Sequence, residues 1–205
     1  MRWGVVGVGR AGRARMAALQ GDPRALLAAT FRGGGGLEVG SFAELFAQVD
    51  AVAICSPDAT HAGYARKALL ARKHVVVEFP VATSEVEARN LFALARRMGR
   101  VLHVEHIELL HAPQQILRAH ARKALQQRMK ITFERQGSGT ESATEITQTN
   151  IARLHRLVDI GGPVASIEKV AISAGRLAAE VTFETGIFGS LDFQAGPYFS
   201  RQTQF

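Results

Sequence analysis

The chain has 205 residues, 47% of them hydrophobic, a formal net charge of +7 and a single cysteine, Cys55. This length allows one large domain or two small ones, and one cysteine excludes an internal disulfide framework and favours a reducing, cytoplasmic setting. No apolar run approaches the roughly 20 residues of a membrane-spanning helix, so we expect no membrane partner. The arginines are scattered and not interleaved with aromatic residues, so we expect a small anionic ligand and no nucleic acid.

The first predicted elements are a strand over residues 2–6 and an alanine-rich helix over residues 10–20, joined by a turn with three glycines in G-x-G-x-x-G order. In this context the first glycine permits a tight turn and the second lets the backbone approach a pyrophosphate. The third lets the helix pack close to the sheet, and the helix N-terminus attracts the phosphates. The stretch predicts dinucleotide binding, the alternative being a turn without a ligand. The predicted cofactor-binding residues here are Gly7, Gly9, Arg10, Ala11 and Gly12.

Strand and helix patterns continue to alternate up to about residue 110. Such alternation, with continuously apolar strands, predicts a parallel sheet covered on both faces, a doubly wound Rossmann domain. Ser84 and Glu87 form a predicted capping box, and Gly99 is the matching helix stop. The predicted strands are residues 2–6, 26–31, 51–55, 74–77 and 100–103, and the predicted helices are residues 10–20, 42–49, 61–71 and 84–98.

The end of the second predicted strand indicates the cofactor. An enzyme that prefers NAD usually has Asp or Glu about 20 residues after the glycines, where the carboxylate holds the ribose 2′-hydroxyl. This chain has Phe31-Arg32 there, followed by a run of glycines. A guanidinium cannot accept a hydrogen bond from a hydroxyl, but its fork matches a 2′-phosphate. We therefore expect NADPH, with NADH as the alternative. The other interpretation of Arg32 is a solvated side chain beside a loose loop.

Polar residues follow the later strands at the edge where a doubly wound sheet binds its ligand. Cys55 has no basic partner close in sequence, which favours a buried, inert thiol over a nucleophile. After the fifth strand, His103 and Glu105 would share one face of an extended segment, with His106 on the other. This spacing does not predict a metal site and favours polar groups lining a cofactor cleft. The further residues expected at the cofactor are Cys55, Ser56, His61, Glu78 and Phe79.

From about residue 112 the pattern changes to two helices and a series of strands. Sequential strands joined by short turns predict a largely antiparallel sheet. The expected elements are a basic helix over 113–127, a strand over 129–135, a polar loop over 136–149, a helix that carries 150–159, strands over 166–173, 177–185 and 187–194, and a candidate strand after 197. The expected domains are a Rossmann domain over 1–111 and an α+β domain over 112–205, and the end of the chain in strand-like sequence suggests that a C-terminal portion is missing.

These motifs resemble those of the Gfo/Idh/MocA oxidoreductases, and most closely those of the biliverdin reductases of the A type in that family. The resemblance implies a Rossmann domain followed by a sheet that forms a wall of the substrate cleft. It also implies hydride transfer from NADPH to the central methine bridge of biliverdin, giving bilirubin. The wider family has Glu-Lys-Pro, with a proton-transferring lysine, where this chain has Glu78-Phe79-Pro80, so a sugar dehydrogenase is disfavoured. Biliverdin reductases of the animal type have tyrosine at the position of Phe79, so this chain lacks the tyrosine hydroxyl and any role that it has. The resemblance rests on residues 6–12, 54–56, 73–80 and, most specifically, 99–110.

The resemblance also suggests catalytic residues. Arg153 and Arg156 are three positions apart on a predicted helix and share a face, where related reductases have similar arginines. They are interpreted as anchors for two propionates or guides for a proton, the alternative being a solvated pair. Glu78, Glu105 and Glu108 match acidic residues that the family places near the nicotinamide, where a carboxylate can stabilise positive charge. No general acid is assigned, because solvent can deliver the proton.

Three alternatives remain open at this point. One is a Gfo/Idh/MocA enzyme with a different substrate, and another is a catalytically silent NADP-binding sensor. The third concerns assembly: an exposed face of the second sheet is compatible with a homodimer, but no pattern requires one.

Overall fold

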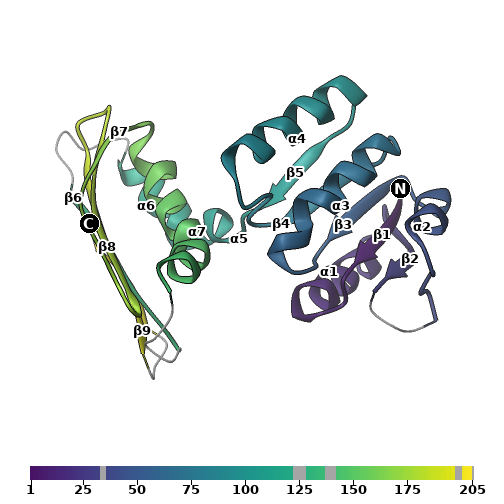
Figure 1. The fold of residues 1–205 in the computed structure, drawn as a ribbon, viewed down its shortest axis with the longest axis horizontal. Helices are drawn as coiled ribbons and strands as arrows, with labels where there is room; N and C mark the ends of the chain where they lie inside the picture. The colour runs from purple at the N-terminus through teal and green to yellow at the C-terminus, as the bar shows by residue number, and fades with distance from the viewer. Residues whose placement is uncertain (33–35, 122–127, 137–141, 197–199, 205) are drawn as a thin grey trace. The chain divides into compact units, whose positions relative to one another are not determined.

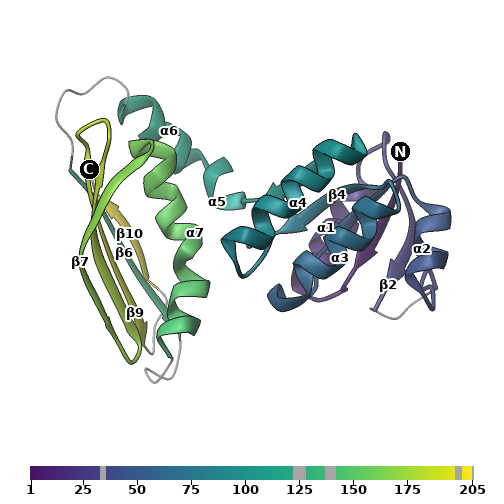
Figure 2. The ribbon, with the colours of Figure 1, turned by 45° about the horizontal axis from the view of Figure 1, so that its top comes forward.

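The structure, a computed structural model, describes residues 1–32, 36–121, 128–136, 142–196 and 200–204. They form two compact units, Met1–Glu105 and His106–Phe205 (Figure 1, Figure 2). From the sequence, the boundary is expected after residue 111, whereas the structure divides the chain after Glu105, before a short helix. Each unit has its own sheet and its own hydrophobic core.

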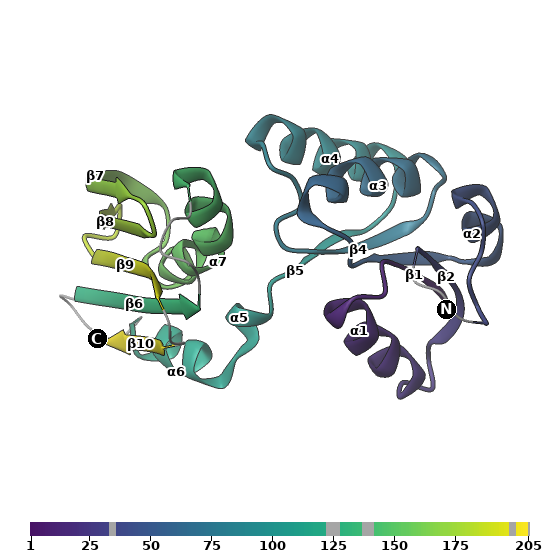
Figure 3. The ribbon, with the colours of Figure 1, turned by 60° about the horizontal axis from the view of Figure 1, so that its bottom comes forward.

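The first unit is built on a parallel sheet with the strand order β2-β1-β3-β4-β5. Helix α1 covers one face, and α2, α3 and α4 cover the other (Figure 3). Because both faces are covered, the central strands are apolar throughout, and every residue of Ala51–Ile54 is buried. The predicted doubly wound Rossmann domain is confirmed. Its elements are β1 (Arg2–Val6), α1 (Arg10–Gln20), β2 (Leu26–Phe31), α2 (Phe42–Gln48), β3 (Ala51–Ile54), α3 (Asp58–Leu70), β4 (His74–Glu78), α4 (Glu85–Met98) and β5 (Leu102–Glu105).

The ends of two helices illustrate what local sequence determines. Ser84 caps α4 by accepting a hydrogen bond from the backbone N–H of Glu87 at 3.2 Å, and Gly99 ends the helix in a left-handed conformation, as predicted. The expected start of α3 at residue 61 is wrong, since the helix begins at Asp58. Pro57 in extended conformation precedes it, and a carboxylate in the first turn is favourable beside the positive end of the helix dipole.

The second unit has a sheet with the strand order β10-β6-β9-β8-β7. Strands β6 and β9 are parallel, and the other neighbouring pairs are antiparallel, so the predicted largely antiparallel sheet is confirmed. Helices α6 and α7 lie on the same side of this sheet (Figure 2). The elements are α5 (Ile107–Leu110), α6 (Ala112–Ala121), β6 (Arg128–Gln136), α7 (Ala143–Gly161), β7 (Val164–Ser173), β8 (Arg176–Phe183), β9 (Phe188–Gly196) and β10 (Ser200–Gln204).

Helix α7 begins earlier than the sequence predicts. The polar loop expected over 136–149 is wrong at both ends, because Gln136 still belongs to β6 and α7 begins at Ala143. Residues 137–141, within that expected loop, and 122–127, the expected end of the preceding helix, lie outside the described residues. Polar and β-branched side chains are weak helix formers, but packing of the later turns overrides this preference. Leu157 of α7 is fully buried against the sheet with Phe183, and a Cβ at Gly161 would overlap the Phe183 ring.

Among the described helices, none has the length and apolar character needed to cross a bilayer.

Candidate functional site

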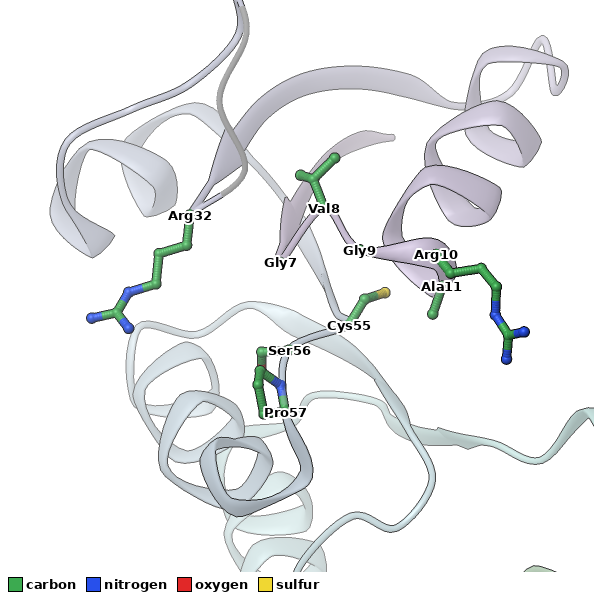
Figure 4. A pocket seen from close by; sticks show the side chains of 9 residues that line it. All are labelled: Gly7, Val8, Gly9, Arg10, Ala11, Arg32, Cys55, Ser56 and Pro57. Atoms are coloured by element: carbon green, nitrogen blue, oxygen red, sulfur yellow. The ribbon is translucent and has the colours of Figure 1, made fainter. Parts of the chain in front are cut away.

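A pocket of about 640 Å³ opens at the carboxyl ends of β1 and β3 (Figure 4). These neighbouring strands lead into helices on opposite faces of the sheet, α1 after β1 and α3 after β3. This is the topological switch point at which open α/β sheets bind their ligands. Seven of the predicted cofactor residues line the pocket, and the structure adds Val8 and Pro57. The lining residues are Gly7, Val8, Gly9, Arg10, Ala11, Arg32, Cys55, Ser56 and Pro57.

The three glycines of the turn have different neighbours. Gly7 has a φ of 84°, and a Cβ there would lie 2.8 Å from the carbonyl oxygen of Cys55. A Cβ at Gly12 would overlap the carbonyl oxygen of Gly7, so the helix can approach the turn only without a side chain. A Cβ at Gly9, in contrast, would meet nothing within 4 Å. Packing within the fold therefore requires glycine at positions 7 and 12. At position 9 the fold would accept a side chain, and the space beside Gly9 is part of the pocket.

The N-terminus of α1 points a partial positive charge at this space. Gly9 is the N-cap, so no side chain caps the helix, and no acidic residue stands in its first turn. The unsatisfied N–H groups and the helix dipole favour an anion here. Arg10 and Arg32 add positive charge from either side of the glycine turn (Figure 4). The residues present therefore fit the pyrophosphate of a dinucleotide.

Arg32 follows β2 at the rim of the pocket, and none of the described residues that line the pocket is acidic. Its φ is 59°, in the left-handed region that L-residues seldom adopt. The guanidinium carbon lies 5.6 Å from the centre of the Phe31 ring and 5.8 Å from that of Tyr64. The side chain is exposed, but it rests on aromatic rings.

The carboxylates that end β4 and β5 share one arginine that sequence reasoning missed. Nη2 of Arg15 lies 3.1 Å from Oε1 of Glu78 and 3.0 Å from Oε2 of Glu105. Burial opposes the charge of Arg15, but the two carboxylates outweigh burial and raise its pKa above the ordinary value. The available signal was helical spacing, because Arg15 lies on the same stripe of α1 as the buried Gly12 and Leu19. It is therefore directed at the sheet.

Arg15, Glu78 and Glu105 form an ion-pair cluster. Cys55 lies beside this cluster and lines the pocket. Its thiol donates a hydrogen bond to Glu78 Oε1 at 3.8 Å. Burial, reinforced by the negative charge of Glu78, raises the pKa of Cys55 to about 12. The thiolate is thus scarce at neutral pH, which agrees with the inert thiol predicted from the sequence.

We expect Cys55 to resist alkylation in the folded chain. At pH 8, iodoacetamide should modify it at least about a hundredfold more slowly than it modifies the chain unfolded in urea, because only the thiolate reacts. Mass spectrometry of timed samples measures both rates. Similar rates in the two states would contradict the raised pKa.

Four predicted cofactor residues are not among those that line the pocket: Gly12, His61, Glu78 and Phe79. The His61 side chain is 1% exposed, so it cannot touch a ligand as expected. Its Nδ1 lies 2.7 Å from the carbonyl oxygen of Pro80, and its Nε2 lies 2.7 Å from that of Ser56. His61 therefore joins the loop after β3 to the loop after β4 and supports the pocket wall from behind.

The remaining predicted catalytic residues lie in the second unit. Arg153 Nη2 is 3.0 Å from Glu108 Oε1, and both side chains are largely buried. Arg156 is 3% exposed, and its Nε donates to Oε1 of Gln114 at 2.9 Å. The alternative of a solvated pair is therefore wrong, while the role of the two arginines as propionate anchors or proton guides stays a prediction. The helical spacing was correct, but α6 supplies a side chain, Gln114, that covers one of the two arginines.

His106, at the start of this unit, pairs with His155 of α7. The rings of His106 and His155 meet edge to face, 4.7 Å between centres. Burial, with the neighbouring His155 as a further cause, lowers the pKa of His106. In the described part of the chain, no three His, Cys, Asp or Glu side chains are grouped so that they could hold a metal ion.

A parallel sheet with a glycine turn and a pocket at its switch point defines a dinucleotide-binding protein of the Rossmann class. A family model described as "Oxidoreductase family, NAD-binding Rossmann fold" matches residues 1–106, about half of the chain. The chain belongs to this family, the Gfo/Idh/MocA oxidoreductases.

Curated relatives are similar over about half of the chain. Biliverdin reductase A of Mus musculus is 40% identical over 121 residues, which are 52% of this chain and 39% of that protein. UDP-N-acetylglucosamine 3-dehydrogenase of Acidithiobacillus ferrooxidans is 35% identical over 130 residues, 58% of this chain and 41% of that protein. The matches thus span about two fifths of these relatives, which have different substrates.

Solved structures share the fold over nearly the whole chain. Biliverdin reductase from Synechocystis sp. PCC 6803, in complex with biliverdin and NADP⁺, has a TM-score of 0.80 at 24% identity, covering 97% of this chain and 73% of that one. The WlbA dehydrogenase from Chromobacterium violaceum, in complex with NADH and UDP-GlcNAcA, has a TM-score of 0.85 at 18% identity, covering 100% and 74%. Similarity at this level defines the fold, while the choice between NADP and NAD depends on the chain's own residues.

Proposed function

We propose that this chain acts as an NADPH-dependent reductase that converts biliverdin to bilirubin. In the balanced reaction, a hydride from NADPH and a proton add to biliverdin, giving bilirubin and NADP⁺. The observation that carries the proposal is the pocket itself, with an open space at Gly9, an uncapped helix N-terminus and Arg32 at its rim. The bound NADPH would supply the hydride.

The residues of the first unit would hold this cofactor by its anionic groups. The turn from Gly7 to Gly12 and the N-terminus of α1 would bind the pyrophosphate. Arg32 stands where an NAD-specific protein would have a carboxylate, and its guanidinium suits a 2′-phosphate. NADPH is accordingly the proposed cofactor and NADH the alternative.

The ion-pair cluster at the ends of β4 and β5 would contribute charge to the reaction. Two carboxylates against the one guanidinium of Arg15 leave a net negative charge there. Negative charge near a nicotinamide ring stabilises the positive charge that the ring gains when its hydride leaves. Arg15 would keep Glu78 and Glu105 together at this edge, and the protonated thiol of Cys55 would add no charge of its own.

The residue after Glu78 supports a bilin over a sugar. Oxidation or reduction at a sugar carbon moves a proton to or from the substrate oxygen, and the ring of Phe79 cannot transfer one. A pyrrole nitrogen of biliverdin can take its proton from solvent. The 40% identity to a biliverdin reductase favours the same substrate class, whereas the match to UDP-N-acetylglucosamine 3-dehydrogenase keeps a nucleotide sugar as the second candidate.

The test is a turnover assay with the purified chain. Mixed with NADPH and biliverdin, it should consume both in equal amounts, followed by the loss of the bilin absorbance band and of NADPH absorbance. A parallel reaction with UDP-N-acetylglucosamine and NADP⁺ or NAD⁺ tests the second candidate. Binding of NADPH without any loss of the bilin band would refute the proposed substrate, and dehydrogenation of the nucleotide sugar would replace it.

A further inference from the structure

The ring of Tyr64 has two positively charged side chains within 6 Å of its centre, and one of them, Arg32, lines the pocket. The guanidinium carbon of Arg32 is 5.8 Å from the ring centre, and Nζ of Lys67 is 5.9 Å from it. Tyr64 and Lys67 are three positions apart on α3, so they share one face of that helix. Arg32 comes from a different element, the end of β2. Two cations from distant parts of the sequence thus make cation–π contacts with the same ring.

The aromatic residues beneath these cations form a packed group. The ring centres of Phe31 and Phe42 are 4.5 Å apart, and those of Phe42 and Tyr64 are 4.9 Å apart. All three rings pack against the core of the first unit. Lys67 Nζ is also 5.0 Å from the centre of the Phe42 ring. Cation–π contacts with these packed rings favour the observed positions of both charged groups.

The charges of Arg32 and Lys67 are not neutralised by any carboxylate in the described part of the chain. Within the residues that the structure describes, neither Arg32 nor Lys67 forms an ion pair with a carboxylate. Like charges that share one ring repel each other, so an anion placed beside both would be attracted by each. A left-handed φ at a non-glycine residue is the kind of backbone strain that clusters at ligand sites, and Arg32 has it at the pocket rim.

The charge of the anion indicates its chemistry. A phosphate monoester carries about −1.5 to −2 at pH 7, whereas a phosphodiester carries about −1. Two cations match the monoester, and in a phosphorylated dinucleotide the only monoester is the 2′-phosphate on the adenosine. The pyrophosphate is accounted for by the glycine turn and α1.

We propose that Tyr64 holds Arg32 and Lys67 as a two-cation site for the 2′-phosphate of NADPH, and that Lys67 and Tyr64 therefore determine cofactor preference together with Arg32. This inference rests on the proposed function and extends it to two residues of α3. The hydroxyl of Tyr64 has no part in it, because the face of the ring makes both contacts.

The experiment measures dissociation constants of NADPH and NADH by fluorescence titration at low ionic strength. Lys67→Met should weaken NADPH binding about five- to tenfold and leave NADH binding unchanged, since one cation at the phosphate is lost. Tyr64→Leu should reduce the preference for NADPH about two- to fivefold, while Tyr64→Phe should retain it. Arg66→Met is the matched control, because it removes the same charge from an exposed neighbouring position of α3 and should leave both affinities unchanged.

The outcomes separate this inference from the proposed function. A wild-type chain that binds NADPH no better than NADH would refute the proposed cofactor and this inference with it. A wild-type chain that prefers NADPH, with the same preference in Lys67→Met and Tyr64→Leu, would refute this inference alone. A loss shared equally by NADPH and NADH would show that the two residues support the fold and not the phosphate.

Discussion

Replacement of Gly9 by alanine is expected to weaken NADPH binding by at least about tenfold while lowering the free energy of unfolding by at most about 1 kcal/mol, the cost of alanine in place of a glycine N-cap. The Cβ would meet no protein atom within 4 Å, so the fold should accept it. It would, however, occupy the side of the turn that a pyrophosphate must approach, and loss of charge-assisted backbone contacts costs on the order of 1.5–3 kcal/mol. Fluorescence titration gives the affinity, and thermal unfolding followed by circular dichroism gives the stability.

The matched variant is Gly12→Ala, which adds the same methyl group one turn further along. Its Cβ would overlap the carbonyl oxygen of Gly7, so α1 or the turn must shift. Overpacking of this kind costs about 1–3 kcal/mol, and the free energy of unfolding should fall by that amount. Unchanged NADPH affinity in a folded Gly9→Ala protein would show that this turn does not bind the pyrophosphate, and the proposed cofactor site would be wrong.

Replacement of Arg15 by methionine is expected to destabilise the chain by about 1–3 kcal/mol, because Glu78 and Glu105 would then face each other without a cation. The estimate lies below that for a fully buried pair, since the three side chains are 14–27% exposed and water screens the charges. Urea denaturation followed by circular dichroism measures the change in the free energy of unfolding.

Two further variants make this result specific. Arg13→Met removes the same charge from an exposed position of α1 whose guanidinium donates to the backbone carbonyl of Val8 and pairs with none of the described carboxylates, so its effect should stay within about 0.5 kcal/mol. Adding Glu78→Gln to Arg15→Met should recover part of the loss, because it removes one of the two repelling charges. If Arg15→Met and Arg13→Met have the same effect, the ion-pair cluster does not stabilise the first unit.

Much of the first unit and its pocket follows from local sequence. The glycine spacing, the apolar run before it and the alanine-rich helix after it are contiguous, so they predict the turn and the ligand that it admits. The residues after β3 are predictable for a related reason. Parallel strands end at a common edge, and Cys55 and Ser56 therefore had to come near the turn once the fold class was known.

Helical periodicity predicts which residues share a face but not what covers that face. For this reason Arg153 and Arg156 were correctly grouped, while the contact of Arg156 with Gln114 was not foreseen. The same limit applies to α1, where the stripe containing Arg15 was visible but its carboxylate partners were not. The early start of α7 depends on packing against the second sheet, which overrides weak local preferences.

The sequence by itself determined the order of strands and helices in the first unit, the dinucleotide turn and the absence of a carboxylate directly after β2, because each depends on residues adjacent along the chain. Only the tertiary structure decided that Arg15 joins two carboxylates, that His61 is buried behind the pocket wall and that Tyr64 contacts two cations. These contacts join side chains from different strands and helices. Their partners are chosen by how the elements pack, and no spacing within one element contains that information.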